Sequence, residues 1–431
     1  MIMKYKLHSL LASLAVCASV NAQNPISPYG VYIADPVARV FNGKVYIYGS
    51  LDESTNYYCS NRYHILESSN LTDWTLHMNS FTNPETLYDP DALYKDGTYY
   101  LYYDTPDGKE LVATSKSPIG PFADGVQIQG INGIGPGAFM DDDGQAYYFW
   151  GQFSAKGAKL NLDMKTLDMS TMKDGVVTEK EHFFHEGMFV FKRGKYYYFI
   201  YASVARKNQA TGLAYAMSTN PLGPYEYKGH IIDNSGCDPG VWNIHGSVLE
   251  YQDKWYVLYH RSTHGTCYMR KACIEPLRFA KDGSIIEAEM TSQGAAGPLK
   301  ASEPTDGARA CLMNGHARIC LMEGRTDREV LSGIRSGDWA AFKYMDFSSK
   351  NPTKVTFRVR TKAACKIGVG YDQYFRGSRF TVDAPDTGNE WKEITADIPQ
   401  DNSVNGVHAV FLFFSGDNDQ DLMELDWMRF C

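Results

Sequence analysis

The sequence has no dense run of lysine and arginine, and its formal net charge over 431 residues is only −8. Proteins that bind nucleic acid or anionic membrane surfaces usually carry such basic clusters, so we expect neither partner. Beyond the N-terminus no apolar segment approaches the roughly 20 residues that a membrane span requires. Long stretches of 3.6-residue periodicity are scarce, which argues against parallel α/β folds. No CxxC pair is present to suggest a metal site.

The N-terminus carries the pattern of an export signal. Two lysines fall within the first six residues, residues 10–20 are apolar, and an A-x-A-like cleavage site follows at Ala22. We therefore expect residues 1–22 to be removed and the protein to be exported to the periplasm or the extracellular space. Cys17 leaves lipoprotein processing open, but Val16 before it fits that processing poorly.

Eight of the nine cysteines remain after the signal is removed. An exported compartment permits disulfides, although the sequence does not determine their pairing. Cys311 and Cys320 are close enough along the chain to close a small loop. We expect mostly buried thiols with one or two bridges.

Tyrosine and tight turns are abundant, and they recur together. Five segments share a turn followed by a tyrosine-rich or aliphatic run, and each predicts a hairpin of two strands. The turns are spaced 54, 47, 50 and 59 residues apart. A period of about 50 residues with several strands per unit is typical of propeller blades. The turn residues are Gly43, Gly97, Gly144, Gly194 and Asp253.

We therefore predict an all-β chain with two domains. A five-bladed β-propeller spans residues 23–284, and a β-sandwich of jelly-roll type spans residues 285–431. The blade pattern stops after Gly283, and short strands such as those at 356–361 and 408–414 follow without a blade turn. About 145 residues of this kind suit a sandwich.

Polar residues recur six to nine residues before the blade turns. The innermost strands of all blades face one axis, so side chains at equivalent positions face one shared cavity. Asp35, Asp91 and Glu186 stand there in blades one, two and four, His245 in blade five and Gly135 in blade three. Apolar residues flank each acid, where an unpaired carboxylate is costly. Strand capping explains any one acid, but three in register favour a functional site.

Three carboxylates around one pocket fit glycoside hydrolysis. One acid protonates the leaving oxygen, one carboxylate activates water, and the third helps to set the proton affinity of the first. Acids from separate blades leave room for that water, as the separation of roughly 6.5–9.5 Å in inverting enzymes requires.

The same residues carry a resemblance to glycoside hydrolase family 43. The chain is similar to this family in an early Asp-Pro, an x-Pro-Asp in blade two and a Glu-Gly in blade four, within a match over most of residues 29–286. The resemblance implies Asp35 as general base, Glu186 as general acid and Asp91 as the acid that tunes and orients Glu186. Asp89, two residues away on the same strand face, is a second candidate for the tuning acid.

The resemblance also covers residues that bind a metal ion and the substrate in the family. Residues 243–247 resemble the fifth blade of the family, where His245 faces a central water-bound ion, commonly calcium. Arg270 resembles an arginine that contacts substrate hydroxyls. The family frequently has Ile-Asp-Pro before the third turn, whereas this chain has Gly135 in place of the aspartate. The missing side chain implies a different pocket shape or subsite preference. Candidate platforms for sugar faces, with core packing as the alternative, are Trp150, Phe139 and Trp242.

The C-terminal part resembles carbohydrate-binding module family 6 in four short segments, at 286–289, 337–339, 406–408 and 425–427. The resemblance implies a structural calcium held by the hard oxygen ligands of Glu287, Glu289 and Asp426. Gly333 and Ile334 stand where the usual sugar-stacking ring would be, and Trp391 fits a packing role. Docking against the propeller is the alternative to sugar binding.

Together these features predict an inverting exo-glycosidase, associated with calcium and needing no organic cofactor. Its expected substrates are α-L-arabinofuranosyl or β-D-xylosyl units of plant polysaccharides or their oligosaccharides. Alternatives are an endo-acting arabinanase or xylanase, a galactan-cleaving enzyme, a propeller that binds carbohydrate without turnover, or a purely structural propeller. The expected protein is a monomer.

Overall fold

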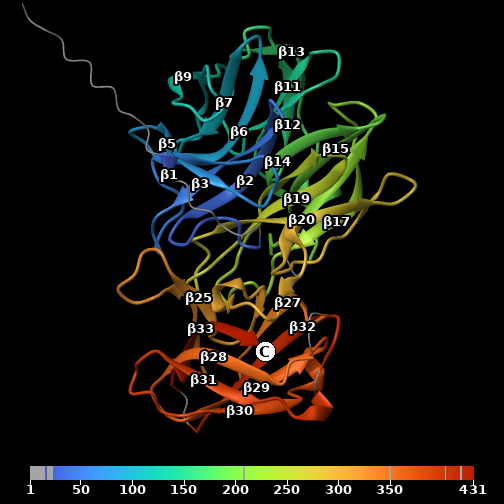
Figure 1. Cartoon of the computed structure of the whole chain (residues 1–431). Coiled ribbons are helices and arrows are strands. Elements are labelled where there is room, and N and C mark those ends of the chain that lie inside the picture. The colour runs from blue at the N-terminus through green and yellow to red at the C-terminus, as the bar shows by residue number, and fades with distance from the viewer. Residues whose placement is uncertain (1–14, 17–22, 207–208, 349–350, 403, 418–419) are drawn as a thin grey trace, which may run out of the picture.

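The computed structural model of the chain describes residues 15–16, 23–206, 209–348, 351–402, 404–417 and 420–431. The described part is almost entirely β-structure, with one short α-helix, α1 (Glu179–His182) (Figure 1). No helix of this part is long and apolar enough to cross a membrane. The predicted signal peptide, with its cleavage site and Cys17, lies outside the described residues except for a two-residue strand, β1 (Ala15–Val16).

Five antiparallel sheets follow one another along the chain, and in each sheet consecutive strands pair. We number them as blades one to five; β1 adds to the outer edge of blade one. Blade one contains β2 (Tyr32–Phe41), β3 (Lys44–Asp52), β4 (Arg62–Ser68) and β5 (Thr75–Thr82), and blade two contains β6 (Tyr88–Lys95), β7 (Thr98–Asp104), β8 (Glu110–Ser115) and β9 (Ala123–Gln127). Blade three contains β10 (Gly137–Met140), β11 (Ala146–Trp150), β12 (Lys156–Leu160) and β13 (Leu167–Lys173), and blade four contains β14 (Phe184–Arg193), β15 (Tyr196–Ser203), β16 (Gly212–Ser218) and β17 (Glu226–Asp233). Blade five contains β18 (Gly246–Tyr251), β19 (Lys254–Arg261), β20 (Lys271–Phe279) and β21 (Ile285–Ile286).

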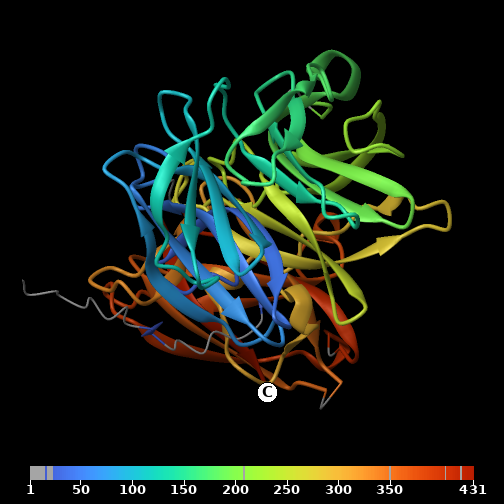
Figure 2. The same ribbon diagram turned by 90° about the horizontal axis from the view of Figure 1, so that it is seen from above.

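The first strands of the five sheets form a closed ring. β2 contacts β6, β6 contacts β10, β10 contacts β14, β14 contacts β18, and β18 returns to β2. The sheets are therefore the blades of a five-bladed propeller, as the repeat predicted (Figure 2). At the closing joint the Ser247 hydroxyl accepts from the N–H of Ala38 (3.0 Å) and donates to the carbonyl of Pro36 (2.9 Å).

The predicted turns and tyrosines explain why the blades form. Asn42 and Gly43 have φ of 51° and 75°, and Asp96 and Gly97 have 49° and 76°. Positive φ at both central residues matches the twist of paired strands. The second strand of every blade also buries a tyrosine whose hydroxyl donates a hydrogen bond, so that this hydroxyl is not left unpaired in the core. These tyrosines are Tyr48, Tyr102, Tyr148, Tyr198 and Tyr259.

Two further sheets enclose one apolar core and form the predicted sandwich. The first contains β22 (Leu299–Lys300), β24 (Leu312–Met313), β27 (Trp339–Asp346), β29 (Cys365–Tyr371), β30 (Phe380–Ala384) and β32 (Val407–Ser415). The second contains β23 (Thr305–Asp306), β25 (Arg318–Leu321), β26 (Glu329–Ile334), β28 (Lys354–Thr361), β31 (Lys392–Asp397) and β33 (Met423–Phe430). Four 3₁₀ turns are η1 (Gly294–Ala296), η2 (Gly307–Arg309), η3 (Tyr374–Arg376) and η4 (Gln400–Asn402).

All eight described cysteines are free thiols. The one or two bridges that we expected are therefore not formed. Five of the eight are buried, which agrees with the expected packing role.

Candidate active site

An acid-lined pocket of about 220 Å³ opens where the innermost strands of the blades begin. The pocket is lined by three acids that the sequence offered as candidates, Asp35, Asp89 and Glu186, and by His245 and Arg270. The full lining is Asp35, Tyr58, Cys59, Tyr88, Asp89, Asp104, Ile134, Glu186, Asn243, His245 and Arg270.

Irregular strand pairing re-aims the side chains at the start of each acid-bearing blade. The register of β2 on β3 shifts between Ala34 and Val37, and that of β6 on β7 shifts between Tyr88 and Asp91. The register of β14 on β15 shifts on both sides of Glu186. A bulge adds a residue to one strand and turns the neighbouring side chains out of the regular alternation.

Three residues that precede prolines mark equivalent positions in blades one to three. Asp35, Asp89 and Gly135 have left-handed φ of 50°, 39° and 70°. A side chain in such a conformation costs about 1–3 kcal/mol, so it persists only where the surroundings hold it. Asp89 is therefore the counterpart of Asp35, and blade three offers no carboxylate at this position.

Asp91 lies behind the pocket and does not line it. Both its oxygens accept from Nη2 of Arg39 at 2.7 Å, and the Ala138 N–H donates to Oδ2 at 2.8 Å. Asp91 and Asp89 do not share a strand face, because the bulge between them breaks the alternation. The pocket thus brings Asp89, and not Asp91, together with Asp35 and Glu186.

Asp35 is held in its ionised form by its neighbours. Its Oδ1 lies 2.8 Å from Nη1 of Arg270 and 3.3 Å from Nδ1 of His260. Burial opposes ionisation, but Arg270 and the nearby histidines outweigh it and hold the pKa of Asp35 well below its usual range. Oδ2 of Asp35 is buried and has no hydrogen-bond partner among the described residues. The carboxylate therefore keeps one oxygen free to accept a proton.

Asp89 has the opposite electrostatic character. Burial and the nearby charge of Asp35 raise the pKa of Asp89 to about 6. Nδ1 of His245 lies 3.6 Å from Oδ1 of Asp89 and 3.9 Å from Oδ1 of Asp35. Burial disfavours protonation of His245, but the two carboxylates outweigh it and raise its pKa. Two neighbouring acids with pKa values shifted in opposite directions have the properties that a base and a proton-holding group require.

Glu186 reaches the pocket from blade four with its side chain 22% exposed. Gln152 donates to Oε2 (2.9 Å) and Asn243 to Oε1 (3.5 Å), which orients the carboxyl group. Gly187 follows with φ of 65°, and a Cβ there would lie 2.9 Å from the ring of His245. Only glycine fits, which explains the Glu-Gly pair noted in the sequence.

The predicted substrate residues divide between pocket and core. Arg270 lines the pocket, although Asp35 and Asp52 engage its guanidinium. Trp150 and Phe139 are buried in apolar clusters and do not line the pocket, so they are core residues. Trp242 is 48% exposed and adjoins the pocket residue Asn243, so it remains a candidate platform.

The three acids predicted to hold calcium in the sandwich do not form a site. Glu287 pairs with Arg206, and Glu289 pairs with Lys343. Asp426 is buried between Arg328 and Arg358. These cations take the place that a metal would occupy. In the described part of the chain, the one cluster with metal-ligand spacing is that of Asp35, Asp89 and His245, whose ligand atoms lie within 4.8 Å of one another.

Sequence reasoning missed residues away from the repeat positions, of which Asp104, Tyr58 and Cys59 line the pocket and Asp52 and His260 lie buried behind it. Asp52 and Asp104 end the second strands of blades one and two, β3 and β7. The sequence signal for these two residues was an acid at the end of an aromatic or aliphatic strand, repeated in two blades. His260 is the last residue but one of β19, the second strand of blade five, whereas Tyr58 and Cys59 come from a loop with no repeat.

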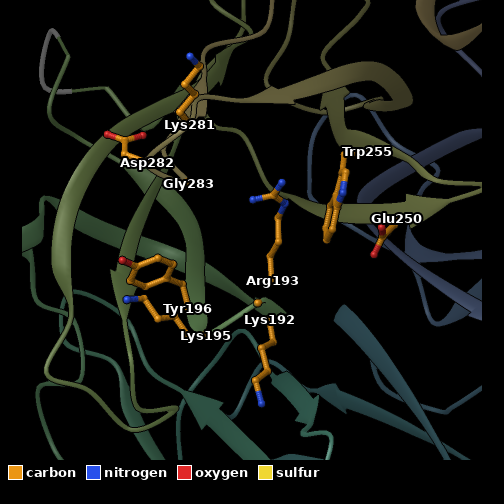
Figure 3. Close-up of a pocket in the computed structure, with 10 residues that line it drawn as sticks. Lys192, Arg193, Lys195, Tyr196, Glu250, Trp255, Lys281, Asp282 and Gly283 are labelled. Atoms are coloured by element: carbon orange, nitrogen blue, oxygen red, sulfur yellow. The ribbon is translucent and has the colours of Figure 1, made fainter.

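A larger, open hollow of about 580 Å³ lies at the other end of the blades. Figure 3 shows its basic and aromatic side chains, which include Arg193, Lys195 and Trp255. Arg193 ends β14 seven residues after Glu186, and seven residues of strand span about 23 Å. This hollow is therefore remote from the acids.

The chain matches two family models: glycosyl hydrolases family 43 over residues 22–285 and carbohydrate binding module (family 6) over residues 320–431. A xylosidase/arabinosidase of Thermoclostridium stercorarium is 28% identical, covering 93% of this chain and 97% of its own. An arabinoxylan arabinofuranohydrolase of Bacillus subtilis (strain 168) is 25% identical, covering 97% and 94%.

Solved structures agree with these matches. A β-xylosidase/α-arabinofuranosidase from a compost microbial metagenome, in complex with xylotriose and in a calcium-free form, has a TM-score of 0.55 at 27% identity. It covers 63% of this chain and 99% of its own. The chain therefore belongs to glycoside hydrolase family 43, is an enzyme that hydrolyses glycosidic bonds, and ends in a module of carbohydrate-binding family 6.

Proposed function

We propose that this enzyme is an inverting exo-glycosidase that releases α-L-arabinofuranosyl or β-D-xylosyl units from plant polysaccharides such as arabinoxylan. The observation that carries the proposal is the pair of carboxyl groups with different surroundings in one pocket. Asp35 is ionised and has a buried oxygen without a partner, while Glu186 is partly exposed and oriented by amide donors. The names of relatives that act on xylosides and arabinosides support the substrate class.

In the proposed mechanism, Asp35 takes a proton from a water molecule through its free Oδ2. That water attacks the anomeric carbon, and Glu186 donates a proton to the leaving oxygen on the other side of the sugar. The bond to the leaving group breaks as the new bond forms on the opposite face, so the anomeric configuration inverts. The third acid is Asp89, which holds a proton near Asp35 and limits the negative charge in the pocket.

The size of the pocket supports exo action. A space of about 220 Å³ suits one terminal sugar rather than a long chain. Arg270 is placed to contact sugar hydroxyls, and Trp242 adjoins the pocket as a platform for a neighbouring sugar.

A hydrated calcium ion beside His245 fits the residues present. Nε2 of His245 is buried without a hydrogen-bond partner among the described residues, while Nδ1 faces the two carboxylates. With a proton on Nδ1, Nε2 accepts a hydrogen bond from a water molecule of the ion. Direct binding to Asp35 is less suitable because Arg270 already occupies Oδ1. A bound calcium ion would supply positive charge near the two acids.

The sandwich offers an exposed aromatic face that suits carbohydrate. Trp339 stacks on Tyr374 with ring centroids 5.6 Å apart, and Tyr374 and Phe375 are 56% and 70% exposed. Trp391, by contrast, is covered by Arg358 and Arg360. We assign polysaccharide binding to the face of Trp339, Tyr374 and Phe375. Export to the periplasm or the outside of the cell, proposed from the N-terminal signal pattern, would bring this face to its substrate.

The reaction of the purified protein with arabinoxylan oligosaccharides tests the proposal. We expect free arabinose or xylose from the first minutes onward, and an inverted anomer as the first product in the ¹H NMR spectrum. Release of longer oligosaccharides first would show endo action, and a retained anomer would contradict the assignment of Asp35. Asp35→Asn should abolish turnover of every substrate.

A further inference from the structure

We propose that Glu329, a residue of the sandwich, is a positioning residue for the catalytic base, so that the second domain completes the active site. This inference rests on the proposed function, in which Asp35 is the general base. Figure 1 shows the sandwich seated directly against the propeller.

The connection begins with a fully buried ion pair between the two domains. Nζ of Lys271, at the start of β20, lies 2.7 Å from each carboxylate oxygen of Glu329, at the start of β26. Both side chains are only 1% exposed. The same ammonium group also donates to the carbonyl of Pro28 at 3.0 Å. A charge buried this completely has few alternative positions.

Arg270 immediately precedes Lys271 and holds the base. Neighbouring residues of an extended chain point to opposite sides, so Lys271 faces the sandwich while Arg270 faces the pocket. Arg270 donates to Asp35 at 2.8 Å, and Asp52 fixes both its backbone N–H and its guanidinium. The position of this segment therefore sets where Arg270 meets Asp35.

Glu329 also holds the segment that leads into the strand of Asp35. The N–H of Gly30 donates to Oε1 of Glu329 at 3.1 Å, five residues before the base. The approach is so close that a Cβ on Gly30 would lie 1.9 Å from the carbonyl oxygen of Thr326. One carboxylate of the sandwich thus binds both segments whose relative position places Arg270 against Asp35.

A second link strengthens the same contact. Arg309, in η2 of the sandwich, donates to the carbonyl of Pro25 at 2.9 Å. The N-terminal segment before β2 is thus tied to the sandwich at Pro25 as well as at Gly30. Arg206 and Glu287 also form an ion pair near the junction, but both side chains are 40% exposed, and their partners do not include Asp35, Arg270 or Glu329. This pair provides a matched control.

The test compares Glu329→Gln with Glu287→Gln in the full chain, on an arabinofuranoside or xyloside at a temperature well below unfolding. We expect Glu329→Gln to lower kcat about 10- to 100-fold with little change in KM, because displacement of a reacting group by about 1 Å has effects of this size. Glu287→Gln should leave kcat and KM unchanged. Wild-type kcat in a folded Glu329→Gln protein, even with a lowered Tm, would overturn the inference.

If Glu329→Gln leaves too little folded protein, the double variant Lys271→Met with Glu329→Gln removes the unpaired buried cation. We expect this protein to fold and to show the same loss of kcat, and a wild-type kcat there would also overturn the inference. Asp35→Asn separates the two claims. An active Asp35→Asn enzyme would contradict the proposed function, whereas an inactive one beside a fully active Glu329→Gln enzyme would contradict only the role of Glu329.

Discussion

Asp35 and Asp89 stand at equivalent positions and owe their different chemistry to their neighbours. Asp35 has Arg270 at 2.8 Å and is ionised, whereas Asp89 has Asp35 as a like-charged neighbour and has a pKa of about 6. Opposite charge nearby favours ionisation, and like charge or burial disfavours it. The difference between the pKa values of the two acids thus arises from side chains that other segments bring beside them.

The two acids of blade two should respond differently to neutralisation. Asp89→Asn should lower kcat about ten-fold without loss of stability, because it removes a proton-holding group from the pocket. Asp91→Asn should leave Arg39 without a counter-charge and lower the free energy of unfolding by about 3 kcal/mol. Urea unfolding and initial rates on both variants check this contrast. The reverse pattern would restore Asp91 as the tuning acid.

Glu110 makes a testable contribution to the pH dependence of stability. Burial raises its pKa from 4.5 to about 8, and among the described residues Tyr148 alone donates to its side chain, at 2.6 Å. The folded protein therefore binds this proton more tightly than the unfolded chain does. The resulting stabilisation is complete below about pH 4.5 and is lost as the pH rises to about 8.

Glu110→Gln should remove this pH dependence while keeping the acceptor for Tyr148. The Tm of the wild type should then fall more steeply between pH 5 and pH 9 than that of the variant. Calorimetric or fluorescence melts at several pH values measure the difference. Parallel curves would show that Glu110 is not protonated in the folded protein.

The repeat predicted the strands of the blades because each hairpin is specified by residues that are close together in sequence. A Gly or Asp turn between two tyrosine-rich strands specifies a hairpin without knowledge of the rest of the fold. The bulges were not predictable in the same way, because they break the two-residue alternation on which register depends. This is why counting back from the turn selected Asp91 rather than Asp89.

Other differences between prediction and structure have tertiary causes. Trp150 and Phe139 are apolar at positions where sequence does not distinguish a pocket wall from the core between blades. The predicted calcium ligand Asp426 is paired with Arg328 and Arg358, which come from strands or loops distant in sequence. Glu329 belongs to no motif, so its contact with Lys271 appears only when the two domains are placed together.

The aromatic face of the sandwich, formed by Trp339, Tyr374 and Phe375, should bind polysaccharide. Tyr374→Ala and Phe375→Ala should each weaken binding to insoluble or gel-embedded arabinoxylan, because each removes an exposed ring. Hydrolysis of a small soluble glycoside should not change. Trp391→Ala is the matched control and should bind as the wild type does. Equal retardation of all variants in affinity gels would place carbohydrate binding elsewhere.

The whole molecule is a closed propeller with a second domain fastened beside its joint. β18 meets β2 at that joint, and His245 lies just before β18. A calcium ion beside His245 would therefore stabilise the entire ring. We expect EGTA to lower the Tm and added calcium to restore it, since a ligand at about 100 times its Kd stabilises by about 2.7 kcal/mol. His245→Ala should abolish the response, and a wild-type Tm indifferent to calcium would contradict the site.

In the proposed mechanism, Glu186 donates the proton and Asp35 activates the water. The most direct test measures Glu186→Gln on a dinitrophenyl glycoside and on an oligosaccharide of the same sugar. The dinitrophenyl group leaves without a proton, so we predict little loss on it and a loss of about 10²–10⁴-fold on the oligosaccharide. Equal losses on both substrates, or full activity on the oligosaccharide, would contradict the account.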